Sequence, residues 1–294
     1  MKPRTLLLLL IVIVILSGCA NLAPHPPLPA DGPNVTVSVL RDTPGLSDYP
    51  IGAYTIPNSQ VIVTKPRKIS TLEGGFAVLG VMAAHSSGKK ASKELVAGVE
   101  NVLGKMLNGY FEEAIFSVAD KSETAKYWSI ENTIGEGGKI VLTPFAYLAP
   151  DSDGNGRLIL FVKSLYLNNK GKKEWSSRYI YQDRAEYQIK GKDSWTSDSG
   201  KHFQEALSRG SQRIVKAMLE DTNRQVAGWS PKPAIIKSSF YDSEPMLLEG
   251  EIMKISSEEV IFNGAGGGPS QSLLHGINIL PRASVEILSP LAKK

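Results

Sequence analysis

The sequence is poor in cysteine: Cys19 is the only one among 294 residues. A single cysteine excludes a disulfide within the chain and every metal site that needs two thiolates. An excess of charge of one sign is also missing, because 33 basic and 29 acidic residues give a net charge of +4. Proteins that bind nucleic acids carry a much stronger basic excess, so we expect no nucleic-acid partner.

Common catalytic patterns are missing as well. The histidines His85, His202 and His275 form neither a His-Glu-x-x-His pattern nor a close pair, and there is no Gly-x-Ser-x-Gly turn around a serine. The acidic pairs Glu112-Glu113 and Glu258-Glu259 are neighbours in sequence, which is typical of solvated positions and not of the facing carboxylates of a glycosidase. The sequence therefore predicts no catalytic residue, no metal site and no cofactor, and a protein that is not an enzyme.

The amino-terminal residues have the order of a secretory signal. Lys2 and Arg4 are followed by eleven unbroken apolar residues at 6–16, and Ser17 and Gly18 are small. A transmembrane helix needs about 20 apolar residues, so this run is too short to remain as a span. We expect residues 1–18 to be a signal peptide.

The residues at the end of this signal carry a resemblance. Leu16-Ser17-Gly18-Cys19 resembles the lipobox of bacterial lipoproteins. The resemblance implies cleavage before Cys19, which then carries a diacylglyceryl thioether and an N-acyl chain such as palmitate. Ala20 follows where many lipoproteins of the inner membrane carry Asp, which favours the outer membrane, facing the periplasm, over the inner membrane. Cleavage removes two basic residues and leaves 31 basic against 29 acidic ones, a net charge of +2.

Residues 19–34 are predicted to be a lipidated, proline-rich tether. Five prolines occur between residues 20 and 34, without any apolar period. Such a segment is expected to be stiff and extended, at about 3 Å per residue. We expect it to hold the folded body away from the lipid surface.

The folded body is predicted to be α+β, with a mostly antiparallel sheet and two long helices over residues 35–228. Alternation and turn residues predict strands, and apolar stripes predict helices. The expected strands are 35–40, 60–64, 139–148, 157–167 and 174–189, and the expected helices are 91–119 and 200–226. The small-residue segment 74–85 is interpreted as a buried helix, with a membrane-touching loop or a subunit contact as alternatives.

Residues 229–294 are predicted to form a small all-β domain after the turn residues near Gly228. Short strands are expected at 234–236, 246–255, 259–262, 277–280 and 285–288. Five short strands in about 60 residues favour a β-barrel-like module. Such modules commonly bind a partner, although a fold alone does not determine a ligand.

A looser resemblance covers residues 35–226. A strand, a long helix, a hairpin whose last strand begins with Gly171-x-x-x-Trp175, and a closing helix are similar to the TolB amino-terminal-like domains of bacterial envelope lipoproteins. This resemblance implies an accessory subunit that works with other envelope proteins. The segment before the first long helix and the carboxy-terminal extension depart from the pattern.

A calcium site is one hypothesis for the turn at Asp151, Asp153 and Asn155. With Gly156, these residues match the first six positions of an EF-hand loop. The bidentate Glu expected at the twelfth position is replaced by Val162, and a hairpin turn explains the same residues without a metal. The sequence leaves the calcium question open and favours the turn.

Four aromatic residues, Trp175, Tyr179, Tyr181 and Tyr187, share odd numbering in one expected strand. A regular strand places them on one face, where they belong to the core or, alternatively, to an interface with a partner.

The sequence thus predicts a membrane-anchored, periplasm-facing lipoprotein that acts as a non-enzymatic binding, scaffolding or accessory subunit. Its partners are the membrane, through lipid on Cys19, and other envelope proteins. The alternatives are a hydrolase of cell-wall or envelope polymer, and an oligomeric secretion component.

Overall fold

The computed structural model of the chain describes residues 26–30, 34–42, 52–64, 88–119, 128–151, 153–239, 245–264 and 275–290. Residues 1–18, the lipidation candidate Cys19 and the segment 74–85 lie outside the described residues.

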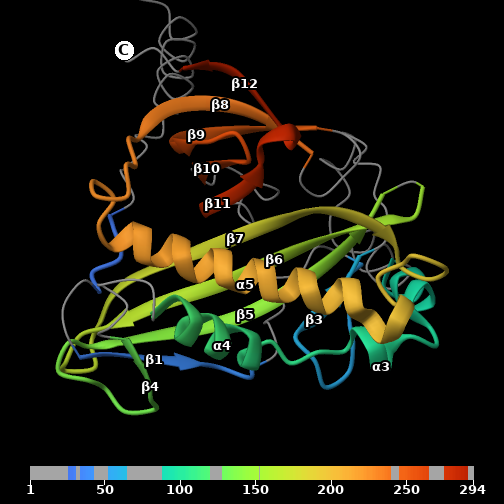
Figure 1. The fold of residues 1–294 in the computed structure, drawn as a ribbon, viewed down its shortest axis with the longest axis horizontal. Helices are drawn as coiled ribbons and strands as arrows, with labels where there is room; N and C mark the ends of the chain where they lie inside the picture. Colours follow the sequence, from blue (N-terminus) through green and yellow to red (C-terminus); the bar gives the residue numbers. More distant parts are fainter. Residues whose placement is uncertain are drawn as a thin grey trace, which may run out of the picture.

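The described residues form one sheet of twelve strands and several helices (Figure 1). The strands are β1 (Val35–Val39), β2 (Tyr54–Thr55), β3 (Val61–Val63), β4 (Trp128–Ile130), β5 (Lys139–Pro150), β6 (Asn155–Leu167), β7 (Lys173–Gln188), β8 (Lys232–Ser238), β9 (Met246–Ile255), β10 (Glu259–Gly264), β11 (Gly276–Pro281) and β12 (Val285–Pro290). The helices include α3 (Glu100–Leu103), α4 (Asn108–Ala119), α5 (Lys201–Thr222) and the 3₁₀ turns η3 (Ser197–Gly200) and η5 (Arg282–Ser284).

The strand order is β12-β8-β9-β10-β11-β7-β6-β5-β1-β4, and β3 pairs with β5 and with β2 beside this path. The two long hairpins, β5–β6 and β6–β7, are antiparallel. The pairings of β1 with β4 and β5, of β3 with β5, and of β11 with β7 are parallel. The predicted α+β class with a mostly antiparallel sheet is therefore confirmed, and every strand predicted from alternation is present within a few residues of its expected bounds.

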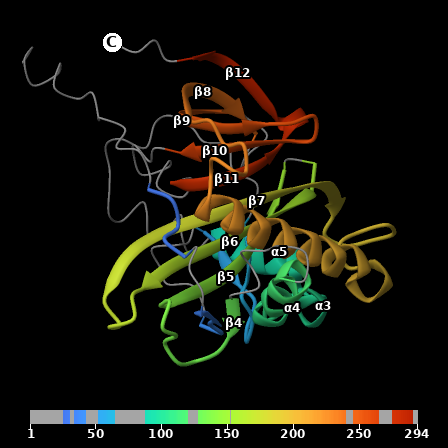
Figure 2. The same ribbon diagram turned by 60° about the vertical axis from the view of Figure 1, so that its left-hand side comes forward.

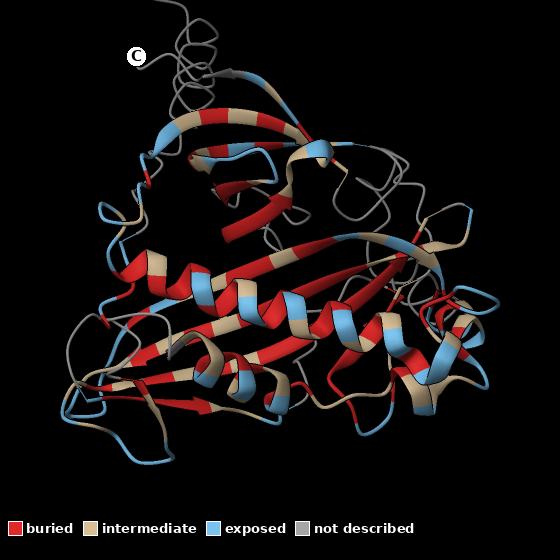
Figure 3. Cartoon of the chain, viewed as in Figure 1, coloured by how far each residue is buried: buried red, intermediate tan, exposed pale blue. Residues whose placement is uncertain are grey.

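The helices lie together on one side of the strands β5–β7 (Figure 2). This side carries the larger apolar core, to which α4, α5 and the inner residues of β1, β5, β6 and β7 contribute. The opposite face of β5–β7 shares a second core with β8–β12 and contains the aromatic group Phe145, Tyr147 and Phe161. Both faces of the central strands are consequently buried (Figure 3).

Helix α5 lies across β6 and β7 because its apolar residues recur at helical spacing and Gly210 permits a close approach. A β-carbon at Gly210 would lie 2.4 Å from Cδ1 of Leu160 and 2.8 Å from Cδ1 of Tyr181. The side of α5 that faces the sheet is buried and the opposite side is exposed (Figure 3). The outer side of α5 therefore lies at the protein surface.

The prediction of one continuous helix over residues 91–119 is wrong, because the structure interrupts it. Residues 88–96, α3 and α4 are helical, but the chain leaves the helix at 97–99, where Gly98 has a φ of 84°, and again at 104–107. The second break is held by Gln60, which is fully buried. Its Oε1 accepts the backbone N–H of Leu107 at 2.8 Å, and its own backbone N–H donates to Lys105 O at 3.0 Å. These bonds replace helical bonds between residues that the apolar period alone would have joined.

The five carboxy-terminal strands continue the sheet. β11 pairs with β7 in parallel, at Ile277 with Tyr179 through Ile279 with Tyr181. Among the described strands, β12 pairs only with β8, so these strands form an open sheet and not the closed barrel expected from their lengths. Within the described ranges, the helices are all too short or too polar to cross a membrane.

Candidate functional site

The last part of the predicted tether is packed against the body. Leu28 and Ala30 are each 1% exposed and belong to the main core. Pro26 O accepts hydrogen bonds from Trp175 Nε1 at 3.0 Å and from Arg224 Nη2 at 3.3 Å. Ala30 O accepts one from Trp128 Nε1 at 3.2 Å. Residues 26–30 of the predicted tether are therefore packed against the folded body.

The attachment of this segment extends into a buried polar cluster. Asp221 accepts hydrogen bonds from Tyr179 Oη at 2.6 Å and from Arg224 Nε at 2.5 Å, and it also bonds to the backbone of Leu28. Burial raises the pKa of Asp221, and Arg224 and Tyr179 oppose this shift. Arg224 also lies 5.9 Å from the ring centroid of Trp229. The cluster thus holds residues 26–30, β7 and the end of α5 together.

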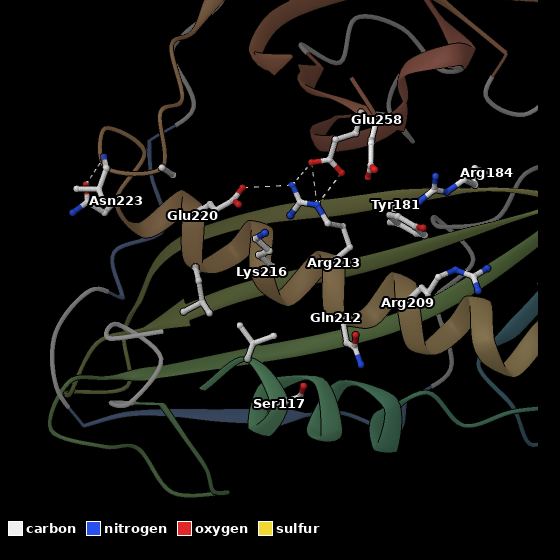
Figure 4. Close-up of a pocket in the computed structure, with 15 residues that line it drawn as sticks. Ser117, Tyr181, Arg184, Arg209, Gln212, Arg213, Lys216, Glu220, Asn223 and Glu258 are labelled. Atoms are coloured by element: carbon white, nitrogen blue, oxygen red, sulfur yellow. Dashed lines mark hydrogen bonds and ion pairs between the residues drawn. The ribbon is translucent and has the colours of Figure 1, made fainter. Parts of the chain in front are cut away.

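A concave site lies along the outer side of α5 (Figure 4). It is a pocket of about 780 Å³ between α5, the end of α4, the outer part of β7 and the turn between β9 and β10. Its lining is rich in charge: Ser117, Val118, Tyr181, Arg184, Arg209, Gln212, Arg213, Lys216, Leu219, Glu220, Asn223, Val226, Ala227, Glu258 and Glu259. Helical spacing from Arg209 to Asn223 aligns one edge of α5 with the pocket.

Arg213 is the central cation of this pocket. Its Nε donates to Glu259 Oε2 at 2.9 Å and its Nη2 to Glu259 Oε1 at 2.5 Å, while Nη2 also lies 3.5 Å from Glu220 Oε2. Glu220 in turn accepts from Trp229 Nε1 at 3.2 Å. Because the Arg213 side chain is only 16% exposed, these pairs are largely shielded from solvent. They join α5 to the β9–β10 turn and correct the expectation that Glu259 is merely solvated.

One nitrogen of the same guanidinium, Nη1 of Arg213, is buried and has no hydrogen-bond partner among the described residues. An unsatisfied charged donor in a pocket lining is costly unless a ligand or solvent provides an acceptor.

A second charged group lies where β7 departs from regular pairing between Arg157 and Ile159 of β6. Asp183 is fully buried and accepts hydrogen bonds from Tyr181 Oη at 3.2 Å and from Arg209 Nη2 at 3.2 Å. Burial and the neighbouring Asp183 carboxylate raise the pKa of Tyr181, so this phenol stays protonated and donates to Asp183. The irregular stretch of β7 thus contributes Asp183, which binds Arg209, and Arg184, which lines the pocket.

Two pocket cations, Arg184 and Lys216, make no ion pair with any described acidic residue, and both are exposed. They are available to an acidic group from outside, whereas the carboxylates of Glu220 and Glu259 are already bound by Arg213. The arrangement is thus equipped to bind an acidic ligand. Sequence reasoning missed these residues, although 209, 213, 216 and 220 follow the polar side of a helix that it had predicted.

The turn proposed as a calcium loop has a structural explanation. Oδ1 of Asp151 accepts the backbone N–H groups of Asp153 at 2.8 Å and Asn155 at 3.0 Å. The β6–β7 turn repeats this pattern: Oδ1 of Asn168 accepts the N–H groups of Lys170 and Lys172, each at 3.0 Å. The side-chain amide of Asn168 thus accepts the same backbone hydrogen bonds as the carboxylate of Asp151. The Asp151 turn therefore requires no cation. Within the described ranges, no group of acidic or histidine side chains has the geometry of a metal site.

The aromatic prediction for β7 is confirmed. Trp175 and Tyr179 are buried in the core beneath α5, and Tyr181 and Tyr187 pack against the same core. Tyr187 stacks on His202, with ring centroids 4.5 Å apart. His202 is thus part of an aromatic contact at the start of α5.

His275 and His85 do not extend the site either. His275 is exposed and its Nδ1 lies 3.2 Å from Gly264 O, while His85 lies outside the described residues.

No family model, no curated protein and no solved structure matches this chain. The lipobox resemblance and the TolB-like resemblance therefore remain predictions from the sequence.

Proposed function

We propose that this chain is a lipid-anchored, non-enzymatic binding protein of the bacterial cell envelope. Cys19 carries the lipid, the destination is the outer membrane facing the periplasm, and the body acts as a scaffold or accessory subunit for other envelope proteins. The signal-like residues 1–18 and the lipobox-like residues before Cys19 support the anchor.

The pocket along α5 is the observation that carries the binding role. Arg184 and Lys216 are exposed cations that line a pocket of about 780 Å³ and have no acidic partner within the described part of the chain. Arg213 adds a buried donor nitrogen for which the described residues provide no acceptor. An envelope protein that inserts an acidic side chain would satisfy these groups, since charge-assisted hydrogen bonds are the stronger ones. The two carboxylates bound to Arg213 hold the pocket in shape.

The division near Gly228 into an α+β body and a carboxy-terminal all-β module also remains part of this proposal. The parallel pairing of β11 with β7 and the contact of Arg213 with Glu259 link the two parts. The pocket would then use residues from both.

Site-specific photocrosslinking in intact cells tests the binding role. A photoreactive residue at Gln212, which is exposed and lines the pocket, should crosslink to a defined envelope protein. The same residue at Glu205, which is exposed on α5 outside the pocket lining, is the matched control. Arg184→Glu with Lys216→Glu should abolish the crosslink from position 212.

Equal crosslinking from both positions, or a crosslink that survives the double charge reversal, would contradict the proposed use of this pocket. Recovery of glycan fragments instead of a protein would favour the hydrolase of envelope polymer.

A further inference from the structure

The bound segment 26–30 limits how far the body can be from its anchor. Cys19 precedes Pro26 by seven residues. An extended chain covers at most about 3.6 Å per residue, so their Cα atoms can be no more than about 25 Å apart. Because Pro26 is held by Trp175 and Arg224, this limit applies to a specific place on the body. It is the end at which β7 begins and α5 ends (Figure 1).

The same end of the molecule carries the β6–β7 turn. Trp175 lies three residues after Lys172, and β6 and β7 pair up to Leu167 with Lys173. The residues 168–174 contain three exposed lysines, Lys170, Lys172 and Lys173, against one acidic residue, Glu174. The turn is therefore a basic projection close to the anchored end.

The turn at the other end of β6 is built in the same way but has the opposite charge. In each turn the first residue donates its N–H to the fifth residue's carbonyl, at 2.8 Å for Asp151 and 3.0 Å for Asn168. In each, the fourth residue is a glycine with positive φ, 82° for Gly154 and 74° for Gly171. The fold therefore accepts either charge, and the basic residues of one turn are not required by its geometry.

Apolar side chains are also exposed at the anchored end. Ile134 is 42% exposed and lies against Gly171. Its Cδ1 would lie 3.3 Å from a β-carbon added to Gly171. Val226, two residues after Arg224, is 83% exposed. Lysines and single apolar residues together suit the headgroup region of a bilayer with anionic lipids.

We propose that the protein stands on the membrane in one orientation, with the β6–β7 turn against anionic headgroups and the β5–β6 turn away from them. The inference rests on the proposed lipid anchor at Cys19. The hydrogen bonds to Pro26 set the proximity, and Lys170, Lys172 and Lys173 make the contact. β6 spans 13 residues, so the two turns are separated by about 40 Å.

The purified full-length lipidated protein can test this orientation directly. Its only native cysteine is consumed by the lipid, so Lys170→Cys and Asp153→Cys each provide one thiol for a fluorescent dye. These positions are equivalent in the two turns and both are exposed. The labelled proteins are inserted into vesicles of phosphatidylcholine and phosphatidylglycerol that contain a lipid with a quencher on its headgroup.

We expect the quenched fraction at position 170 to exceed that at position 153 at least about twofold, given the length of β6. In a second variant, Lys172→Glu with Lys173→Glu should reduce quenching at position 170, and salt at 1 M should do the same, since it shortens the screening length to about 3 Å.

Each outcome bears on a different claim. Protein that floats with the vesicles but shows equal quenching at both positions would overturn the orientation while the anchor stands. Protein that does not float would overturn the anchor and the orientation with it. Unequal quenching that the lysine reversals leave unchanged would overturn the headgroup contact.

Discussion

Leu28→Ala provides a quantitative test of whether the residues just after the proposed anchor at Cys19 belong to the folded body. Leu28 is 1% exposed and packs in the main core. Truncating a buried leucine to alanine costs about 2–5 kcal/mol, and we expect about 3 kcal/mol here because a segment near the chain end can relax into part of the space. For a chain of this size, that loss lowers Tm by roughly 6–12 °C.

The assay is urea unfolding, followed by tryptophan fluorescence, of the soluble chain that begins at Ala20. Val226→Ala is the matched control, since Val226 is 83% exposed and its truncation should change the unfolding free energy by less than about 0.5 kcal/mol. If Leu28→Ala were as harmless as this control, residues 26–30 would be a solvated tether, and the limit on the distance between anchor and body would fall.

Three further changes probe the elements that build the pocket. In a double-mutant cycle, Arg213→Met with Glu259→Gln should give a coupling energy of about 2 kcal/mol by urea unfolding, because the pair is largely shielded. Gly210→Ala should lower stability by about 1–3 kcal/mol through overpacking, and Gly109→Ala, with nothing within 4 Å, should raise it by about 0.5 kcal/mol. Burial raises the pKa of Asp221 in the folded state. The contribution of Asp221 to stability is therefore fully present below its pKa in the unfolded chain and is lost as pH rises through the raised pKa of the folded state. Relative to Asp221→Asn, the wild type should lose stability as pH rises from 4.

A solvent-exposed ion pair provides the control for the Arg213 cycle. Lys237 and Glu286 form a pair at 3.8 Å whose side chains are 42% and 63% exposed, and their cycle should give no more than about 0.5 kcal/mol. Equal coupling in both cycles would mean that the Arg213 pair is as solvated as this one. A wild type that gains stability over Asp221→Asn between pH 4 and pH 7 would contradict the sign of the shift.

Local patterns predicted much of the fold because the residues that carry them obey local rules. Alternating side chains in β5, β6 and β7 predicted each strand, and the odd-numbered aromatic residues of β7 share one face as expected. The turn after β6 follows from Asn168 and Gly171, whose side chain and positive φ define it locally.

The missed features depend on partners far away in sequence. The break at residues 104–107 is due to the buried side chain of Gln60, more than forty residues earlier. Glu259 looked solvated because its partner, Arg213, lies 46 residues before it. The docking of Pro26 depends on Trp175, 149 residues later. No period or motif within a segment reports such contacts, so the pocket along α5 could not be assembled from the sequence.

The lipid on Cys19 is the claim from which the membrane location and the proposed orientation both follow. Mass spectrometry of the amino-terminal peptide from protein purified out of bacterial membranes measures it most directly. The account predicts a peptide that begins at Cys19 and carries the mass of a diacylglyceryl group plus an acyl chain. A peptide that retains residues 1–18, or that begins at Cys19 with an unmodified thiol, would contradict it.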